Sequence, residues 1–225
     1  KIRYWEIWNE PDLSLFYSGS IKKMVELTKE AYKILKEVDK ENMIISPPVT
    51  GYEFLLPWLD MFLGAGGKDY IDIVGTHLYL WFKNDKPEII LKRINIIKGY
   101  MKKHGMKEIP IWDTESGLKK QNLTREQQAS YMLQLAILQW YNDVERFYIF
   151  SWDNRYFVQL VDNDEDLSTL NVAGKQYIVI QKWLIGKTIE KLDSDKNIRI
   201  AHIKNGKGEK AYIIWHTNSD LDSKE

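Results

Sequence analysis

Apolar residues along this chain follow two alternating patterns: short continuous runs, and longer stretches in which they recur near every 3.6 residues. A short apolar run is typical of a strand buried on both faces, and the longer spacing of a helix with one buried face. The strand-like runs cover residues 3–9, 43–46, 70–79, 109–114 and 147–152. The helix-like stretches cover residues 21–38, 53–63, 87–104, 125–141 and 172–184. The pattern therefore predicts five strand–helix units in succession.

Local signals support the predicted helix ends. Ser20 stands directly before the first helical stretch, where a hydroxyl can accept a backbone N–H. Thr124 and Gln127 have the spacing of a capping box before the fourth helix. Gly105 and Gly186 follow the third and fifth helices, as expected of residues that end helices.

Strands that alternate with helices predict an α/β fold of parallel strands with right-handed crossovers. The chain lacks the glycine-rich phosphate loops of nucleotide-binding folds, so a doubly wound nucleotide site is not expected. Five units predict part of a (β/α)8 TIM barrel. The chain begins with Lys1 inside a strand-like run, and we expect it to be a C-terminal fragment that starts at the fourth barrel strand, with only the last five β-α units present.

The pattern changes after the fifth helix. Residues 198–203 alternate between apolar and polar side chains, an Asn-Gly-Lys-Gly sequence at 205–208 supplies a turn, and the chain returns as a second strand-like run at 211–215. This is typical of a β-hairpin. We therefore predict two domains: the barrel part over residues 1–187, and the start of a small accessory β-domain over residues 188–225.

Composition narrows the range of partners. The chain has 32 Lys and Arg and 32 Asp and Glu, for a formal net charge of zero, whereas nucleic acids and anionic membranes require a basic excess. It has no cysteine, and its four histidines lack metal-ligand spacing, so neither a metal nor another cofactor is expected. No apolar run reaches the ~20 residues of a membrane span. A neutral ligand fits this balance, and the oligomeric state stays open.

Two carboxylates lie where barrel enzymes carry their chemistry, at the carboxyl ends of strands. Glu10 follows Trp8-Asn9 and precedes Pro11, and Glu115 follows the strand-like run at 109–114. The alternative for both is a structural carboxylate in a buried ion pair. Glu6 and Asp113 are deeper in the same strands, and for these two we favour that structural role, with a basic partner for Glu6.

The motifs around these carboxylates resemble those of glycoside hydrolase clan A, most closely families 39 and 5. Residues 4–11, Tyr-Trp-Glu-Ile-Trp-Asn-Glu-Pro, match the fourth-strand signature of the clan, and residues 114–117, Thr-Glu-Ser-Gly, match its seventh strand. The resemblance implies that Glu10 is the general acid/base and Glu115 the nucleophile. It also implies that Asn9 hydrogen-bonds the sugar 2-hydroxyl.

Further matches follow in clan order and extend the resemblance to about residue 186. His77 and Tyr79 match the polar residues near the end of the sixth strand. Trp152 matches the tryptophan that lies under the reactive sugar at the end of the eighth strand, and Trp81 is a second candidate for stacking on sugar.

The resemblance implies a retaining hydrolase that cleaves O-glycosidic bonds of β-linked poly- or oligosaccharides, of xylan or glucan type, by double displacement. Two alternatives use the same residues: a catalytically silent carbohydrate-binding homologue, and a transglycosylase that excludes water from the second step. Sugar identity, linkage and endo or exo cleavage depend on loops outside these motifs. A secreted or extracytoplasmic location is an expectation from the substrate class alone.

Overall fold

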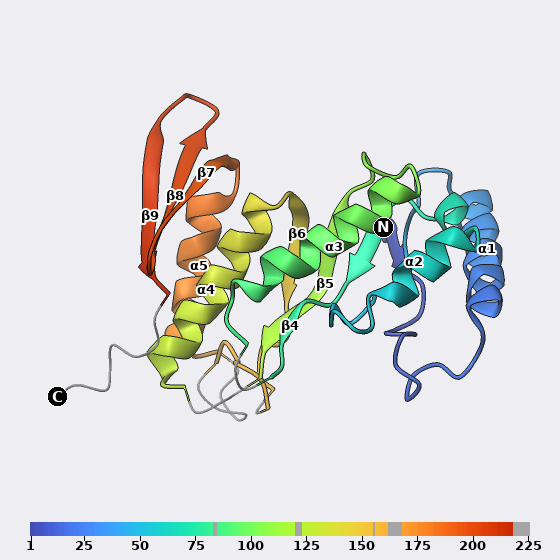
Figure 1. Ribbon diagram of the computed structural model, residues 1–225, viewed down its shortest axis with the longest axis horizontal. Coiled ribbons are helices and arrows are strands. Elements are labelled where there is room, and N and C mark those ends of the chain that lie inside the picture. Colours follow the sequence, from blue (N-terminus) through green and yellow to red (C-terminus); the bar gives the residue numbers. More distant parts are fainter. Residues whose placement is uncertain (83–84, 120–122, 155, 162–167, 218–225) are drawn as a thin grey trace. The chain divides into compact units, whose positions relative to one another are not determined.

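The computed structural model describes residues 1–82, 85–119, 123–154, 156–161 and 168–217 (Figure 1). The chain divides into two compact units. The first comprises Lys1–Leu80, Ile89–Gly117 and Asp143–Ile149, and the second comprises Trp81–Glu88, Leu118–Asn142 and Phe150–Glu225. Among the described residues, no helix has the length and apolar character needed to cross a membrane.

The first unit is built on parallel strands. These are β1 (Tyr4–Glu6), β2 (Met43–Ile45), β3 (Val74–Thr76), β4 (Tyr79–Leu80), β5 (Ile111–Leu118) and β6 (Val144–Ile149). β1 pairs with β2, β3 with β5, and β5 with β6, each time in parallel. A parallel bridge between Ile45 and Ile73 connects the end of β2 to the start of β3. The predicted α/β fold with parallel strands is therefore confirmed.

Three α-helices and one 3-10 helix belong to this unit: α1 (Ile21–Val38), α2 (Pro57–Gly64), η1 (Gly67–Tyr70) and α3 (Ile89–Lys103). α1 has the predicted bounds, and the Ser20 hydroxyl accepts the Lys23 N–H at 3.2 Å. α2 begins four residues later than the predicted start at residue 53. Pro57 occupies its first turn, where a missing N–H costs nothing.

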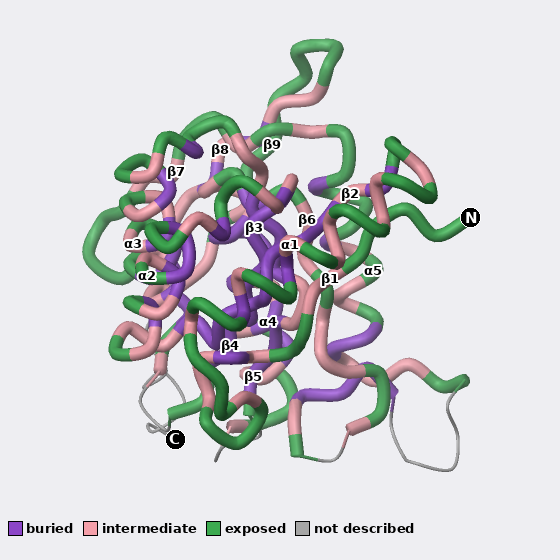
Figure 2. Tube along the Cα trace, turned by 90° about the vertical axis from the view of Figure 1, so that its right-hand side faces the viewer, coloured by how far each residue is buried: buried purple, intermediate pink, exposed green. Residues whose placement is uncertain are grey.

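The core of this unit includes Ile45, Ile73 and Trp112, each less than 5% exposed. β3 and β4 are buried along their whole length (Figure 2). The Trp112 indole N–H donates to Glu145 at 3.3 Å, which gives the buried ring a partner for its one polar atom.

The predicted strand at 70–79 is wrong in its extent, because Tyr70 ends the helix η1 and the strand is interrupted between Thr76 and Tyr79. Leu78 explains the interruption. Its N–H donates to the Asp113 carboxylate at 2.9 Å, and its carbonyl accepts the Ser116 hydroxyl at 3.0 Å. Side chains of β5 therefore hydrogen-bond the N–H and carbonyl of Leu78, which would pair with a neighbouring strand if this strand were continuous.

Two other strands also differ from the prediction. β5 runs on to Leu118 instead of ending at residue 114, and β6 covers Val144–Ile149 instead of 147–152. β6 starts early because the chain turns sharply after α4, through Asp143 with φ 56°. The β5–β6 register shifts between Asp113 and Ser116, so the regular pairing is interrupted at Glu115.

The second unit contains α4 (Arg125–Tyr141), α5 (Val172–Leu184), β7 (Lys187–Asp195), β8 (Ile198–Asn205) and β9 (Lys210–His216). The predicted capping box at Thr124 and Gln127 is confirmed, as are the bounds of α5. The predicted hairpin is present as β8 and β9, and β7 adds a third antiparallel strand that the pattern did not reveal. The boundary at residue 187 stays a prediction, and residues 218–225 lie outside the described residues.

Candidate active site

Four side chains of the first unit meet beside its sheet, from the loop after β1, the segment between β3 and β4, β4 itself and the middle of β5. His77 Nδ1 lies 2.8 Å from Glu10 Oε1 and 3.6 Å from Glu115 Oε2. The Tyr79 hydroxyl donates to the same Glu115 oxygen at 2.6 Å. One ligand-type atom from each of Glu10, His77 and Glu115 can be chosen so that all three lie within 4.8 Å of one another. The two carboxylates therefore come close enough to act on one atom or bond placed between them.

Glu10 does not end a strand, because β1 stops at Glu6 and the carboxylate stands on the loop that follows. Two residues of this loop have positive φ angles, which residues other than glycine rarely adopt: 70° at Trp8 and 42° at Glu10. Such strain costs about 1–3 kcal/mol per residue and persists where surrounding contacts impose it. One such contact is the Trp8 indole, which donates to the Phe16 carbonyl at 3.1 Å.

A second contact fixes the loop just beyond Glu10. Asp12 Oδ2 accepts two hydrogen bonds from Thr50, from the hydroxyl at 2.6 Å and the backbone N–H at 3.0 Å. Burial raises the pKa of Asp12, although the bonds from Thr50 oppose this shift. Sequence reasoning did not identify Asp12 and Thr50 as residues that hold this loop. Only the proximity of Asp12 to Glu10 in sequence could have indicated the former.

Burial differs sharply among the four residues. The His77 side chain is 1% exposed and that of Glu10 12%, whereas Glu115 is 34% exposed. Glu115 is therefore the carboxylate of this cluster that is most open to a ligand.

The charges of this cluster affect its two other members. Burial by itself lowers the pKa of His77, but the hydrogen bond with Glu10 and the negative charges of Glu115 and Glu6 outweigh it, so the pKa lies above the ordinary value. Burial and the bond to Glu115 both raise the pKa of Tyr79. His77 is therefore biased toward the imidazolium, and Tyr79 stays a neutral hydrogen-bond donor.

The remaining predicted site residues do not join this cluster in the described contacts. Asn9 is exposed on the Glu10 loop. Trp81 and Trp152 belong to the second unit, where they are 38% and 46% exposed. The Lys119 ammonium lies over the Trp81 ring, 4.6 Å from its centre. Sugar binding by these three residues stays a prediction.

The donor set of the cluster is also one that metals use, because two carboxylates and an imidazole are common metal ligands. Glu10, His77 and Glu115 could each offer one ligand atom to a cation. His77 Nδ1, however, is already engaged with Glu10 at 2.8 Å, and a raised pKa disfavours the neutral imidazole that metals bind. The geometry thus allows a cation but does not require one, and the absence of a metal stays a prediction.

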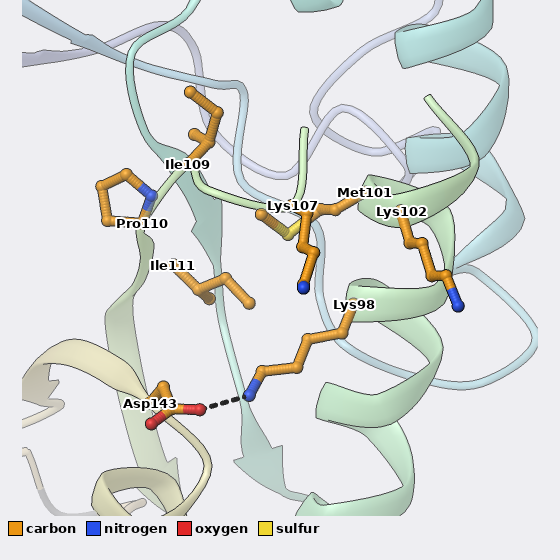
Figure 3. A pocket seen from close by; sticks show the side chains of 8 residues that line it. All are labelled: Lys98, Met101, Lys102, Lys107, Ile109, Pro110, Ile111 and Asp143. Carbon is orange, nitrogen blue, oxygen red and sulfur yellow. Dashed lines mark hydrogen bonds and ion pairs between the residues drawn. The ribbon is translucent and has the colours of Figure 1, made fainter. Parts of the chain in front are cut away.

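A hollow of about 300 Å³ elsewhere in this unit contributes none of these groups (Figure 3). Its lining includes Ile111, the first residue of β5, four residues before Glu115. Asp143 is the one carboxylate among the described residues that line it, and Lys98 crosses the hollow to form an ion pair with Asp143 at 2.9 Å. The hollow brings no second carboxylate of the described residues beside Asp143, so the cluster of Glu10, His77, Tyr79 and Glu115 is the candidate active site.

Comparison with solved structures shows what this fold is similar to. A family 39 glycoside hydrolase from Bacteroides cellulosilyticus aligns with a TM-score of 0.76 and 18% identity, over 97% of this chain and 48% of the other. A family 51 α-L-arabinofuranosidase from Bifidobacterium longum aligns with a TM-score of 0.74 and 10% identity, over 96% of this chain and 53% of the other.

An endo-β-1,3-glucanase of family 128 from Sorangium cellulosum also aligns, with a TM-score of 0.57, 18% identity and coverage of 78% and 69%. The chain therefore spans about half the length of the first two of these relatives. No curated protein sequence matches the chain. The family model of the glycosyl hydrolase catalytic core matches residues 2–177, and the chain belongs to that family.

Proposed function

We propose that the protein is a retaining glycoside hydrolase that cleaves β-linked poly- or oligosaccharides, with Glu115 as nucleophile and Glu10 as general acid/base. The closeness of the two carboxylates carries this proposal. One oxygen of Glu10 and one of Glu115 lie within 4.8 Å of each other. Such closeness favours a small carboxyl separation over the separation of about 6.5–9.5 Å with which an inverting enzyme admits a water. A separation of about 5–5.5 Å is typical of retention.

The surroundings of each carboxylate support its role. Glu115 is the more exposed of the two and accepts the Tyr79 hydroxyl, which orients one oxygen and leaves the other able to attack the anomeric carbon. Glu10 is nearly buried and has one oxygen engaged with His77, so the proton that it delivers to the leaving oxygen stands on the other. In the second step Glu10 takes a proton from water, which attacks the anomeric carbon and releases Glu115.

A (β/α)8 barrel whose last five units lie in this chain is part of the same proposal, as is the domain boundary at residue 187. Asn9, Trp81 and Trp152 remain proposed sugar-binding residues, from the clan resemblance. A xylan- or glucan-like substrate is favoured by the neutral composition of the chain and by the clan resemblance. Relatives named as an endo-β-1,3-glucanase and an α-L-arabinofuranosidase show that this fold serves several sugars, so the assay needs a panel.

The test is hydrolysis of aryl β-xylosides, β-glucosides and α-L-arabinofuranosides by the full-length protein and two variants. Glu115→Gly should abolish turnover, and added azide should restore it with formation of an α-glycosyl azide from a β-glycoside. Glu10→Ala should retain activity only on substrates with good leaving groups.

The outcomes separate the alternatives. Full activity in both variants would exclude the assigned roles. Saccharide binding without any hydrolysis by the wild type would favour a silent binding protein. Products longer than the substrate would identify a transglycosylase.

A further inference from the structure

Glu6 is predicted from the sequence to be a structural carboxylate, but its contacts relate it to the candidate active site. It is the last residue of β1, and Oε1 lies 4.0 Å from His77 Nε2. Its other oxygen, Oε2, is buried without a hydrogen-bond partner among the described residues, and so is His77 Nε2. The buried His77 Nε2 therefore faces the Glu6 carboxylate, whose side chain is 27% exposed, across a distance longer than a hydrogen bond.

The position of Glu6 is determined by the strands around it. A Cβ atom on Gly75 would stand 3.2 Å from Glu6 Oε2, 3.0 Å from the Ser46 carbonyl and 2.9 Å from Ile45. The need for glycine at this point of β3 comes mainly from Ile45 and the Ser46 carbonyl, and a larger residue would also crowd the Glu6 carboxylate. The Gly75 N–H in turn donates to the Ser46 hydroxyl at 2.9 Å, which holds β3 in this position.

His77 thus stands between two carboxylates, one at each ring nitrogen. Nδ1 faces Glu10 at 2.8 Å, and Nε2 faces Glu6 at 4.0 Å. A neutral imidazole carries one hydrogen and can satisfy only one of these acceptors as a donor, whereas the imidazolium carries two. The other titratable groups around His77 are Glu115, at 3.6 Å from Nδ1, and Tyr79, which donates to Glu115.

We propose that Glu6 is a positioning residue that acts through His77, holding the ring protonated on both nitrogens so that Nδ1–H donates to Glu10 Oε1. This inference rests on the proposed function of Glu10. With Glu6 present, Glu10 Oε1 accepts a hydrogen bond from His77, so the proton that Glu10 transfers is confined to Glu10 Oε2. Without Glu6, a neutral ring with hydrogen on Nε2 can instead accept the Glu10 proton at Nδ1 and withdraw it from the leaving group. No proton leaves His77 in the catalytic cycle.

The first test measures His77 directly. The imidazole is titrated by NMR in protein with labelled histidine, and its resonance is assigned with His77→Gln. In Glu6→Gln we expect the titration midpoint to move to lower pH, because a negative charge that favours the imidazolium is removed. Glu6→Asp keeps the charge at a greater distance and should give an intermediate midpoint. Glu53→Gln, a half-buried carboxylate that pairs with Lys92 at 3.4 Å, is the matched control and should leave the midpoint unchanged.

The second test asks whether the effect reaches Glu10. In Glu6→Gln we expect kcat/KM to fall about 10- to 100-fold for aryl glycosides with poor leaving groups, the range known for loss of an outer partner of a metal-bound histidine. For 2,4-dinitrophenyl glycosides, which need no acid, the loss should be small. A purely structural role would lower kcat/KM equally for both substrates.

Each outcome bears on the inference. An unchanged His77 midpoint in Glu6→Gln overturns it, and so does a loss that is equal across leaving groups. If the wild type hydrolyses nothing, the proposed function fails, and the NMR titration still decides whether Glu6 controls His77. If Glu6→Gln unfolds, the same two measurements on Glu6→Asp decide the matter through its intermediate midpoint and leaving-group dependence.

Discussion

The Tyr79 hydroxyl lies 2.6 Å from Glu115 Oε2 and donates its hydrogen to that oxygen. Tyr79 is 6% exposed, and both its burial and this bond raise its pKa, so it remains a donor across the pH range of most enzymes. The bond links β4 to β5 at the point where the pairing of β5 with β6 is interrupted. The nucleophile proposed for this protein is therefore oriented by a neighbouring strand.

Replacement of Tyr79 by Phe should slow the second chemical step more than the first. In the proposed mechanism Glu115 leaves the glycosyl-enzyme as a carboxylate, and the Tyr79 hydroxyl, which donates to Glu115, would stabilise the charge that forms on it. A hydrogen bond to a charged group contributes about 1.5–3 kcal/mol, so we expect deglycosylation to slow at least tenfold. Stopped-flow measurement with a dinitrophenyl glycoside should show a larger burst than in the wild type. An unchanged kcat without added burst would contradict the role of Tyr79.

His77 should make stability depend on pH in a defined direction. Its pKa in the folded protein is raised above the ordinary value of about 6.5, so over the interval between the two values the folded state binds more protons than the unfolded state. The stability that His77 contributes is complete below pH ~6.5 and is lost as pH rises through the folded-state pKa. Urea unfolding of wild type and His77→Gln should therefore show a free-energy difference that shrinks with rising pH. A difference that grows with pH would refute the assignment.

Asp113 should matter for stability through its hydrogen bond with the Leu78 backbone. Its carboxylate accepts the buried Leu78 N–H at 2.9 Å, and it is fully buried itself. Asp113→Ala removes this acceptor and should lower the free energy of unfolding by about 2–3 kcal/mol. Asp113→Asn keeps an acceptor oxygen and should cost less, which makes it the matched control. If urea unfolding shows equal losses of stability for Asp113→Ala and Asp113→Asn, the charge of Asp113 stabilises the fold and its bond to Leu78 does not.

Zinc should inhibit the enzyme, and chelators should not. Glu10, His77 and Glu115 can offer ligand atoms within 4.8 Å of one another, and a bound cation would occupy both carboxylates to which we assign catalytic roles. We expect inhibition by Zn²⁺ that is competitive with substrate and weakened in His77→Gln, and unchanged activity after treatment with EDTA. Loss of activity in EDTA that Zn²⁺ restores would instead make the cluster a catalytic metal site.

Elements with local end signals could be predicted closely from the sequence. The bounds of α1 and α5 match the prediction, since Ser20 accepts from Lys23 and the Asn171 side chain accepts from Gly174, three residues onward in each case. The interrupted strand around Leu78 could not be predicted, because its partners are the Asp113 and Ser116 side chains, about 35 residues away in sequence. β7 was missed because its side chains lack strict alternation, and its pairing with β8 has a register shift after Ile189.

For the candidate site, the sequence by itself determined the chemical groups: two glutamates in recognisable motifs, a histidine and a tyrosine two residues apart. Strand-end position predicted that they would meet, because the carboxyl ends of neighbouring parallel strands lie at one edge of a sheet. Only the tertiary structure decided which nitrogen of His77 faces Glu10, and that Glu6 faces the other. These choices rest on two contacts of His77, from Nδ1 to Glu10 at 2.8 Å and from Nε2 to Glu6 at 4.0 Å. They also rest on Gly75, whose missing side chain leaves space beside Glu6. Residue order carries no such distances, because they arise from how separate strands pack.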